Sequence, residues 1–169
     1  MDDKTKTQQI SIDDLPLDNE ECVVAGNYVQ GNPQLPSRTT KISYTPSMIK
    51  CISKCGNDIL YFAENFFHIV NLDRGKEKIK LYPVQRKMLT NMVKNNRFAV
   101  VASRQIGKTT IFTIFALWFT CFFNDKTILI VANKEDAAQE VMSRIRLAYE
   151  ELPVWLKPGV KEWQKQSSK

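Results

Sequence analysis

A glycine, a lysine and a threonine stand side by side at residues 107 to 109, near the end of the stretch ASRQIGKTT (102–110). Glycine lets a backbone turn closely around an anion, lysine neutralises phosphate charge, and a threonine hydroxyl can be a ligand of Mg²⁺. This order is typical of a loop that binds the phosphates of a nucleotide. The glycine expected five places before Gly107 is Ala102, whose methyl group is tolerated if φ is negative there.

The residues around the loop predict the two elements that such a site needs. Residues 98–102 (FAVVA) are a short apolar run typical of a buried strand, and residues 108–123 predict a helix that is apolar on all sides. A loop between a strand and a helix N-terminus directs backbone N–H groups towards an anion. Lys108 is then expected to reach the β- and γ-phosphates, and Thr109 is expected to hold Mg²⁺.

Acidic and basic side chains around the loop limit the expected chemistry. Arg104 could stabilise charge on the γ-phosphoryl group, or it could anchor the loop to a carboxylate; the spacing favours neither. Hydrolysis also requires a carboxylate at the end of a further apolar strand. Asp125 follows the end of a predicted helix and Glu135 follows a turn, so neither fits. We therefore expect nucleotide binding, and hydrolysis near background for this chain.

Three segments are predicted along the chain. Residues 1–44 are polar and read as a flexible or loosely docked N-terminal arm, and residues 45–96 read as a helical segment. In that segment, helical spacing up to Val70 predicts two helices separated at residues 56–58. Residues 72–83 read as a loop or a short edge strand, and a further helix can start at Pro83. Residues 97–169 begin an α/β domain, with strands at 98–102 and 127–132 and a final helix from about residue 135. The predicted fold is a P-loop NTPase-type parallel sheet with flanking helices, preceded by the helical segment.

The predicted sheet is incomplete, because parallel sheets typically have about five or six strands and only two are convincing here. We therefore expect the chain to be the N-terminal part of a longer protein, truncated before the acid-bearing Walker B strand. The alternative is a complete small domain with a two-stranded sheet.

Composition and charge narrow the class of protein. The 169 residues are 43% hydrophobic and 25% charged, which fits an ordinary globular chain and excludes a collagen-like or mainly disordered one. The net charge of +6 is uneven, because residues 1–25 contain seven acids and two lysines. A basic remainder is compatible with nucleic acid, and equally with a lysine-rich surface.

The four cysteines form no disulfide framework or zinc motif, which indicates a reducing cytosol and no secretion. The apolar run 111–123 is too short for the roughly 20 residues of a membrane span.

The segment SRQIGKTT (103–110) resembles the variant Walker A motif of the terminase large subunit of tailed bacteriophages, especially the T4-like group. FAENFFHIVNLDRG (62–75), LYPVQRKML (81–89) and LPVWLKPGVKEW (152–163) are similar to the family's flanking segments. The resemblance covers about residues 46–163. It implies an ATP-driven motor that pumps DNA into the procapsid. The family's Walker B pair, coupling motif and nuclease have no counterpart here, so no nuclease activity is assigned.

The resemblance also implies roles for individual residues. Gln85 corresponds to the glutamine that recognises adenine, with Tyr82 beside it, and an amide can pair with both edges of adenine. Gln85 could also be a surface residue of its helix. Lys108 and Arg104 take the catalytic positions, and Thr109 binds Mg²⁺. The residues expected to contact ATP are Tyr82, Gln85, Ser103, Gln105, Ile106, Gly107, Lys108, Thr109 and Thr110.

The partners implied by the resemblance are double-stranded DNA, the portal protein, the small terminase subunit and further copies in a ring, with no membrane. The location implied is the host cytoplasm, at the portal vertex of the procapsid. Two other functions remain open at this stage. One is a helicase-like DNA-remodelling ATPase, which would have a second helicase lobe. The other is a non-enzymatic basic module that binds nucleic acid.

Overall fold

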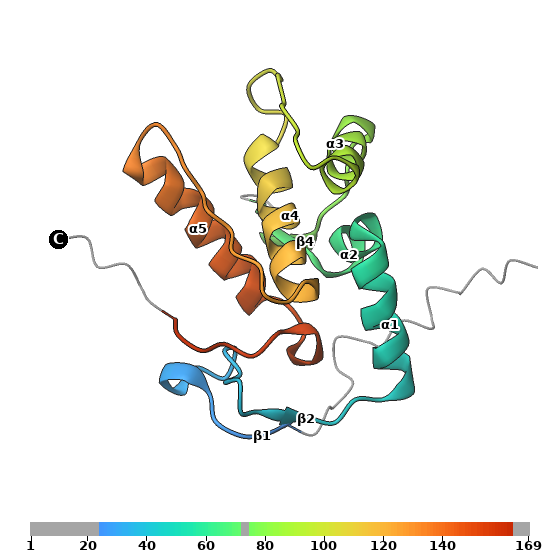
Figure 1. The fold of residues 1–169 in the computed structure, drawn as a ribbon, viewed down its shortest axis with the longest axis vertical. Helices are drawn as coiled ribbons and strands as arrows, with labels where there is room; N and C mark the ends of the chain where they lie inside the picture. The colour runs from blue at the N-terminus through green and yellow to red at the C-terminus, as the bar shows by residue number, and fades with distance from the viewer. Residues whose placement is uncertain (1–23, 72–74, 164–169) are drawn as a thin grey trace, which may run out of the picture.

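A computed structural model describes residues 24–71 and 75–163 (Figure 1). The helices are α1 (Pro46–Asn57), α2 (Ile59–Phe66), α3 (Pro83–Lys94), α4 (Lys108–Phe122) and α5 (Glu135–Glu150), with short 3-10 turns at Val29–Gly31 and Val154–Leu156. The strands are β1 (Val24–Ala25), β2 (Lys41–Ile42), β3 (His68–Asn71) and β4 (Gly75–Lys78). They form two separate two-stranded antiparallel sheets, so the described part mixes helices with small sheets.

The apolar helix predicted after the loop is confirmed as α4, which lies between α5 and the pair α2 and α3 (Figure 1). Its buried side chains include Ile111, Ile114 and Leu117. The indole N–H of Trp118 donates a 2.8 Å hydrogen bond to the carbonyl oxygen of Cys55, which ties α4 to α1. Burial on several sides explains why the sequence of α4 has no polar face.

The helical segment before the loop also agrees with the sequence. Asp58 separates α1 from α2, and its side chain accepts hydrogen bonds from the backbone N–H groups of Leu60 and Tyr61. The helix α3 starts at Pro83, as expected for a proline in the first helical turn. Residues 72–83, predicted as a loop or an edge strand, contain β4, and β3 adds a hairpin that the helical spacing up to Val70 did not predict.

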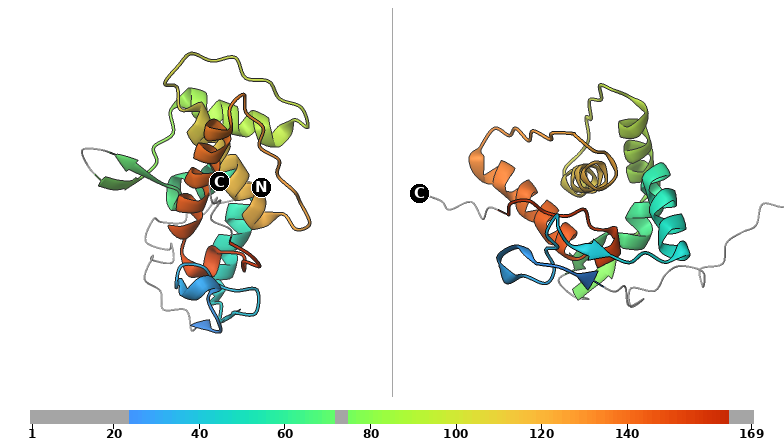
Figure 2. Two further views of the ribbon diagram at one scale, coloured as in Figure 1. Left: turned by 90° about the vertical axis from the view of Figure 1, so that its left-hand side faces the viewer. Right: turned by 60° about the horizontal axis from the view of Figure 1, so that its bottom comes forward.

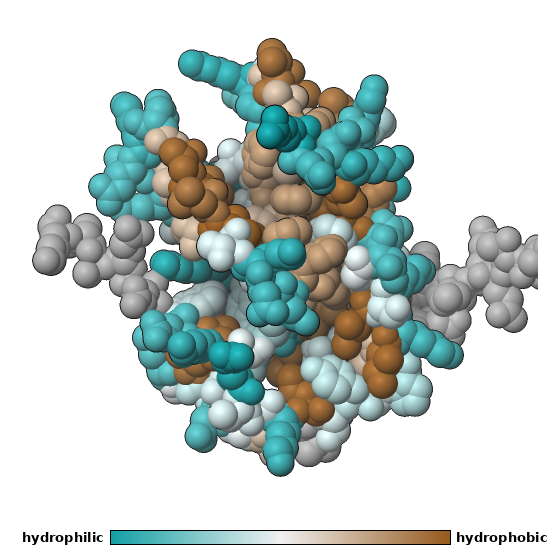
Figure 3. All heavy atoms as spheres, in the orientation of Figure 1, coloured by the Kyte–Doolittle hydropathy of each residue, from teal (hydrophilic) through white to brown (hydrophobic). Residues whose placement is uncertain are grey.

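The predicted parallel strands at 98–102 and 127–132 are not present in the described part of the chain, which corrects the expected P-loop sheet. Both segments are irregular and run outside the helices (Figure 2), although Val100 packs against the core. Val101, Leu129 and Val131 are 103%, 84% and 81% exposed, and apolar side chains also show on the surface in Figure 3. Their composition favours strands, but a strand needs a paired neighbour, and none lies beside them in the described residues.

Part of the predicted loose arm is instead packed against the C-terminal segment. The carbonyl oxygen of Pro36 accepts a 2.8 Å hydrogen bond from the N–H of Val160, and the N–H of Arg38 donates to the carbonyl of Val160. Leu35 is 1% exposed. The side chain of Lys157 donates to the carbonyl oxygen of Gln34 at 3.0 Å. These contacts join residues far apart in sequence, so local composition could not predict them. Residues 1–23, with the acidic cluster, lie outside the described residues.

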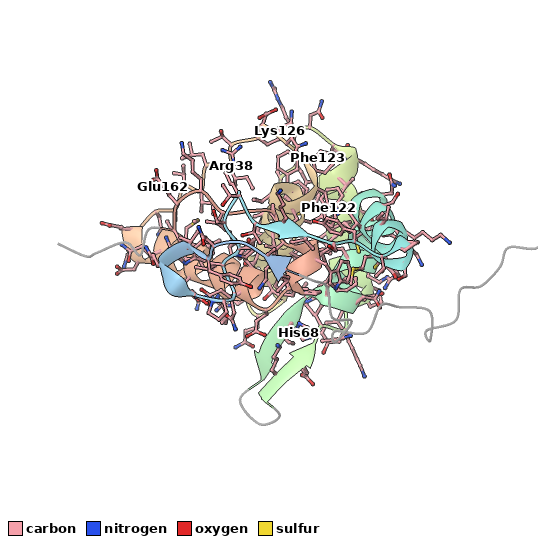
Figure 4. The ribbon with its side chains drawn as sticks, turned by 90° about the horizontal axis from the view of Figure 1, so that it is seen from below. Arg38, His68, Phe122, Phe123, Lys126 and Glu162 are labelled. Carbon is pink, nitrogen blue, oxygen red and sulfur yellow. The ribbon has the colours of Figure 1, made fainter. Side chains whose placement is uncertain are left out.

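The hairpin of β3 and β4 projects from the helices, and His68 marks it in Figure 4. At the opposite side of that view, Phe122 and Phe123 mark the end of α4, and Lys126 lies in the turn that follows. Within the described residues, no helix has both the length and the apolar character needed to cross a membrane.

Candidate nucleotide-binding site

The loop before α4 has the backbone of a tight turn. Residues 104–106 form the turn, and Gly107 is the N-cap of α4 with φ of +82°. That left-handed conformation is accessible to glycine at little cost. Gln105 also has positive φ, at +64°, which is uncommon for a residue with a side chain. Ala102 does not have positive φ, so the backbone condition under which its methyl group is tolerated is met.

The N-terminus of α4 has unused hydrogen-bond donors. The first intrahelical bond runs from the N–H of Ile111 to the carbonyl oxygen of Gly107, at 3.0 Å. The backbone N–H groups of residues 108–110 therefore have no acceptor within the helix. No side chain caps this end, and the first turn contains no acid. Together with the positive end of the helix dipole, these N–H groups make a site that favours an anion.

Lys108 folds back over the loop. Its side-chain nitrogen donates hydrogen bonds to the carbonyl oxygens of Ala102, at 2.9 Å, and Ser103, at 2.5 Å. A lysine ammonium group has three N–H donors, so one donor remains for a ligand. The loop thereby holds a positive charge next to the uncapped helix N-terminus.

Arg104 is exposed, and within the described residues it forms no ion pair or hydrogen bond. The carboxylate that would make it a simple loop anchor is therefore not found in that part of the chain. The carbonyl oxygen of Thr109 accepts a 2.9 Å hydrogen bond from the hydroxyl of Thr113, and the hydroxyl of Thr109 remains available. The structure thus places Arg104, Lys108 and Thr109 on the loop and the first turn of α4.

Gln85 lies directly behind the loop. Its side chain is 7% exposed, and its Nε2 donates a 3.0 Å hydrogen bond to the carbonyl oxygen of Ile106. Its Oε1 accepts a 3.0 Å hydrogen bond from the backbone N–H of Tyr82, the N-cap of α3. The reading of Gln85 as a surface residue is therefore wrong. Tyr82 itself is 70% exposed.

A cavity of about 860 Å³ lies beside Gln85 and the start of α4. Its wall is formed by the β3–β4 hairpin, the start of α3, Thr110 and Thr113 of α4, and Arg144 of α5. Ligand cavities commonly measure about 300–1,000 Å³. The sequence did not single out the hairpin, Thr113 or Arg144, because only tertiary packing brings them to this place and no local pattern marks them.

The displaced pKa values belong to residues outside the loop. A hydrogen bond from Cys55 lowers the pKa of Cys51 to about 7, and burial raises the pKa of Cys121 to about 12. Burial lowers the pKa of Lys157 to about 8. These groups lie in the packed body of the chain, so they are assigned no role in nucleotide binding.

One comparison with known proteins matches the segment that contains this loop. Residues 99–168 match the family described as "Terminase large subunit, T4likevirus-type, N-terminal". The match begins just before the loop and continues through α4 and α5. The resemblance seen in the sequence is thus confirmed over this segment, and residues 99–168 are similar to the N-terminal part of the terminase large subunit of T4-like viruses.

Proposed function

We propose that this chain is the nucleotide-binding part of a DNA-packaging terminase, and that its loop 103–107 with the start of α4 binds ATP and Mg²⁺. The terminase large subunit family is generally an ATPase, and the match over residues 99–168 includes the whole loop. The family match also favours the packaging motor over a helicase or a non-enzymatic basic module.

The uncapped N-terminus of α4 behind Gly107 is the observation that carries this proposal. A long helix that begins at a left-handed glycine, without a capping side chain or an acid in its first turn, leaves its N–H groups for an anion. Lys108 adds a full positive charge at the same place. A phosphate group satisfies the N–H donors and the charge together, which neither water nor a neutral ligand does.

Each proposed role follows from the position of the side chain. The backbone of residues 105–108 surrounds the phosphates, and Lys108 keeps one N–H donor for them. The hydroxyl of Thr109, in the first turn of α4, is a suitable oxygen ligand for Mg²⁺ bound to the phosphates. Arg104 is free to turn towards the γ-phosphate, where a guanidinium stabilises developing charge. The adjacent cavity has the size needed for a nucleoside.

The test is equilibrium titration of the chain with Mg²⁺ and ATP, comparing the natural sequence with Lys108→Ala. Loss of a charge-assisted contact worth about 1.5–3 kcal/mol weakens binding by about 10- to 100-fold. Lys134→Ala is the matched control, because Lys134 is an exposed lysine at the N-cap of another long helix, α5. Equal affinity of the natural chain and Lys108→Ala, with both folded, would contradict the proposal.

The whole motor is proposed to translocate double-stranded DNA into a procapsid in the host cytoplasm. By family similarity its partners are the portal protein, the small terminase subunit and further copies of this chain in a ring. Co-sedimentation of the chain with portal rings, with and without ATP, tests this part of the proposal separately from nucleotide binding.

A further inference from the structure

We infer that Gln85 is a positioning residue, which fixes the phosphate-binding loop by joining Ile106 to the start of α3. This inference rests on the proposed function, since it concerns how the same loop is held. It differs from the role implied by family resemblance, in which this glutamine recognises the adenine base.

The side-chain amide of Gln85 has a defined orientation. Its Oε1 faces the backbone N–H of Tyr82, which can only donate, and its Nε2 faces the carbonyl oxygen of Ile106, which can only accept. Exchanging the two ends of the amide would break both 3.0 Å hydrogen bonds. Because the side chain is also 7% exposed, Gln85 is held on both sides by the chain itself.

The loop also packs closely against this amide. A methyl group added at Gly107 would lie 2.7 Å from Nε2 of Gln85, so the end of the Gln85 side chain would have to move. Gly107 therefore has two constraints, its φ of +82° and its contact with Gln85. The contact between Gly107 and Gln85 and the hydrogen bond from Gln85 to Ile106 therefore fix the position of the turn that precedes Lys108.

The hydrogen bond from Gln85 to Ile106 joins two segments that lie far apart in the sequence. Gln85 is the third residue of α3, and Ile106 follows 21 residues later, after the irregular stretch 98–102. That stretch has no strand pairing in the described part of the chain, so it cannot by itself fix the loop. The helix α3 packs on α4, and Gln85 transmits the position of α3 to the loop.

A positioning role and a base-reading role predict different binding. If Gln85 holds the loop, its loss weakens every ligand that uses the phosphate site, with or without a base. If Gln85 reads adenine, its loss weakens ATP and leaves a ligand without a base unchanged. Inorganic triphosphate is such a ligand, and GTP provides a second base.

The decisive experiment measures the affinities of ATP, GTP and inorganic triphosphate, each with Mg²⁺, for the chain and two variants. Gln85→Glu can still accept from Tyr82 but cannot donate to Ile106. Gln85→Met keeps the side-chain volume and adds no charge. The expected result is a similar loss for all three ligands, about 5- to 10-fold in each variant, because both variants lose the hydrogen bond to Ile106.

The controls separate the possible causes of such a loss. Gln85→Met adds no charge, so a loss of triphosphate binding in this variant cannot come from repulsion by a new carboxylate. Hydrogen exchange at the amide of Ile111, which donates to the carbonyl oxygen of Gly107, is expected to be faster in both Gln85 variants, while exchange within α5 is unchanged. A uniform change over the whole chain would indicate general destabilisation and would overturn the inference.

Two further outcomes would overturn the inference. One is a loss for ATP alone with unchanged binding of triphosphate, and the other is unchanged binding of all three ligands. Lys108→Ala, measured in parallel, shows which proposal has failed. If Lys108→Ala abolishes binding while both Gln85 variants bind normally, only the positioning role is wrong. If the natural chain binds none of the ligands, the proposed nucleotide site is itself wrong, and the positioning role falls with it.

Discussion

The side-chain nitrogen of Lys108 lies 2.9 Å from the carbonyl oxygen of Ala102 and donates a hydrogen bond to it. This contact joins the start of α4 to the beginning of the loop that precedes it. A second bond from the same nitrogen reaches the carbonyl oxygen of Ser103. Lys108 therefore closes the loop and keeps its charge at the N-terminus of α4, where the helix dipole is positive.

Gly107→Ala is expected to destabilise the chain and to abolish nucleotide binding. A left-handed alanine costs about 1–2 kcal/mol, and its methyl group also forces Gln85 to move and lose its bond to Ile106. Urea unfolding measures the free energy of unfolding. Gly31→Ala is the matched control, because Gly31 has φ of +71° but nothing within 4 Å of the added methyl group. Equal losses in the two variants would show that the contact with Gln85 has no energetic effect.

Trp118→Phe is expected to lower the free energy of unfolding by about 1–3 kcal/mol, because the buried carbonyl oxygen of Cys55 loses its donor. The helix α4 should remain formed, so far-ultraviolet circular dichroism should be unchanged. Trp163→Phe makes the same substitution at a half-buried position where the backbone carbonyl, rather than the indole, takes part in a hydrogen bond. If both variants unfold at the same urea concentration, the bond between α4 and α1 contributes no stability.

The free energy of unfolding is expected to increase as the pH rises from about 8 to about 10, because the pKa of Lys157 differs between the folded and the unfolded chain. Burial lowers its pKa from 10.5 to about 8 in the folded chain, while Glu150 and Glu151 act in the opposite direction. Below about pH 8 the amine is protonated in both states. Above it, the unfolded chain binds more protons than the folded one, so the free energy of unfolding increases with pH.

The pKa of the Cys51 thiol is lowered to about 7 in the folded chain, so it also contributes to the pH dependence of stability. Comparing the natural chain with Lys157→Met separates the contribution of Lys157. Urea unfolding at several pH values should give a smaller increase for Lys157→Met. Lys161→Met, at an exposed lysine, should keep the natural dependence. Parallel curves for the natural chain and Lys157→Met would contradict the assignment. The side chain also holds the carbonyl oxygens of Gln34 and Glu150, so the variant tests the docking of the arm as well.

Local signals in the sequence were sufficient to predict the helices. Pro83 starts α3, Asp58 separates α1 from α2, and Gly107 starts α4, each through the conformation of a few adjacent residues. The loop 103–107 before α4 was predicted for the same reason, because the residues that make its turn and its charge are consecutive.

Contacts between distant segments were not predicted. The stretch 98–102 has a strand composition, yet strand formation depends on a neighbour that its own residues do not specify. Polar composition suggested a loose arm up to residue 44, but the buried Leu35 and the bond from Lys157 to Gln34 hold residues 34–35 against the C-terminal segment. In the site, the family resemblance implied that Gln85 contacts the adenine base, whereas in the structure its amide forms hydrogen bonds with Ile106 and Tyr82.

The most direct test of the central claim is to locate bound ATP by the backbone amide chemical shifts of the isotopically labelled chain. On addition of Mg²⁺ and ATP, the largest changes are expected at residues 103–110, in the loop and the first turn of α4. Addition of inorganic triphosphate should move the same amides. Changes that saturate elsewhere while residues 103–110 stay constant, or no changes at all, would contradict the assignment of this loop as a phosphate-binding site.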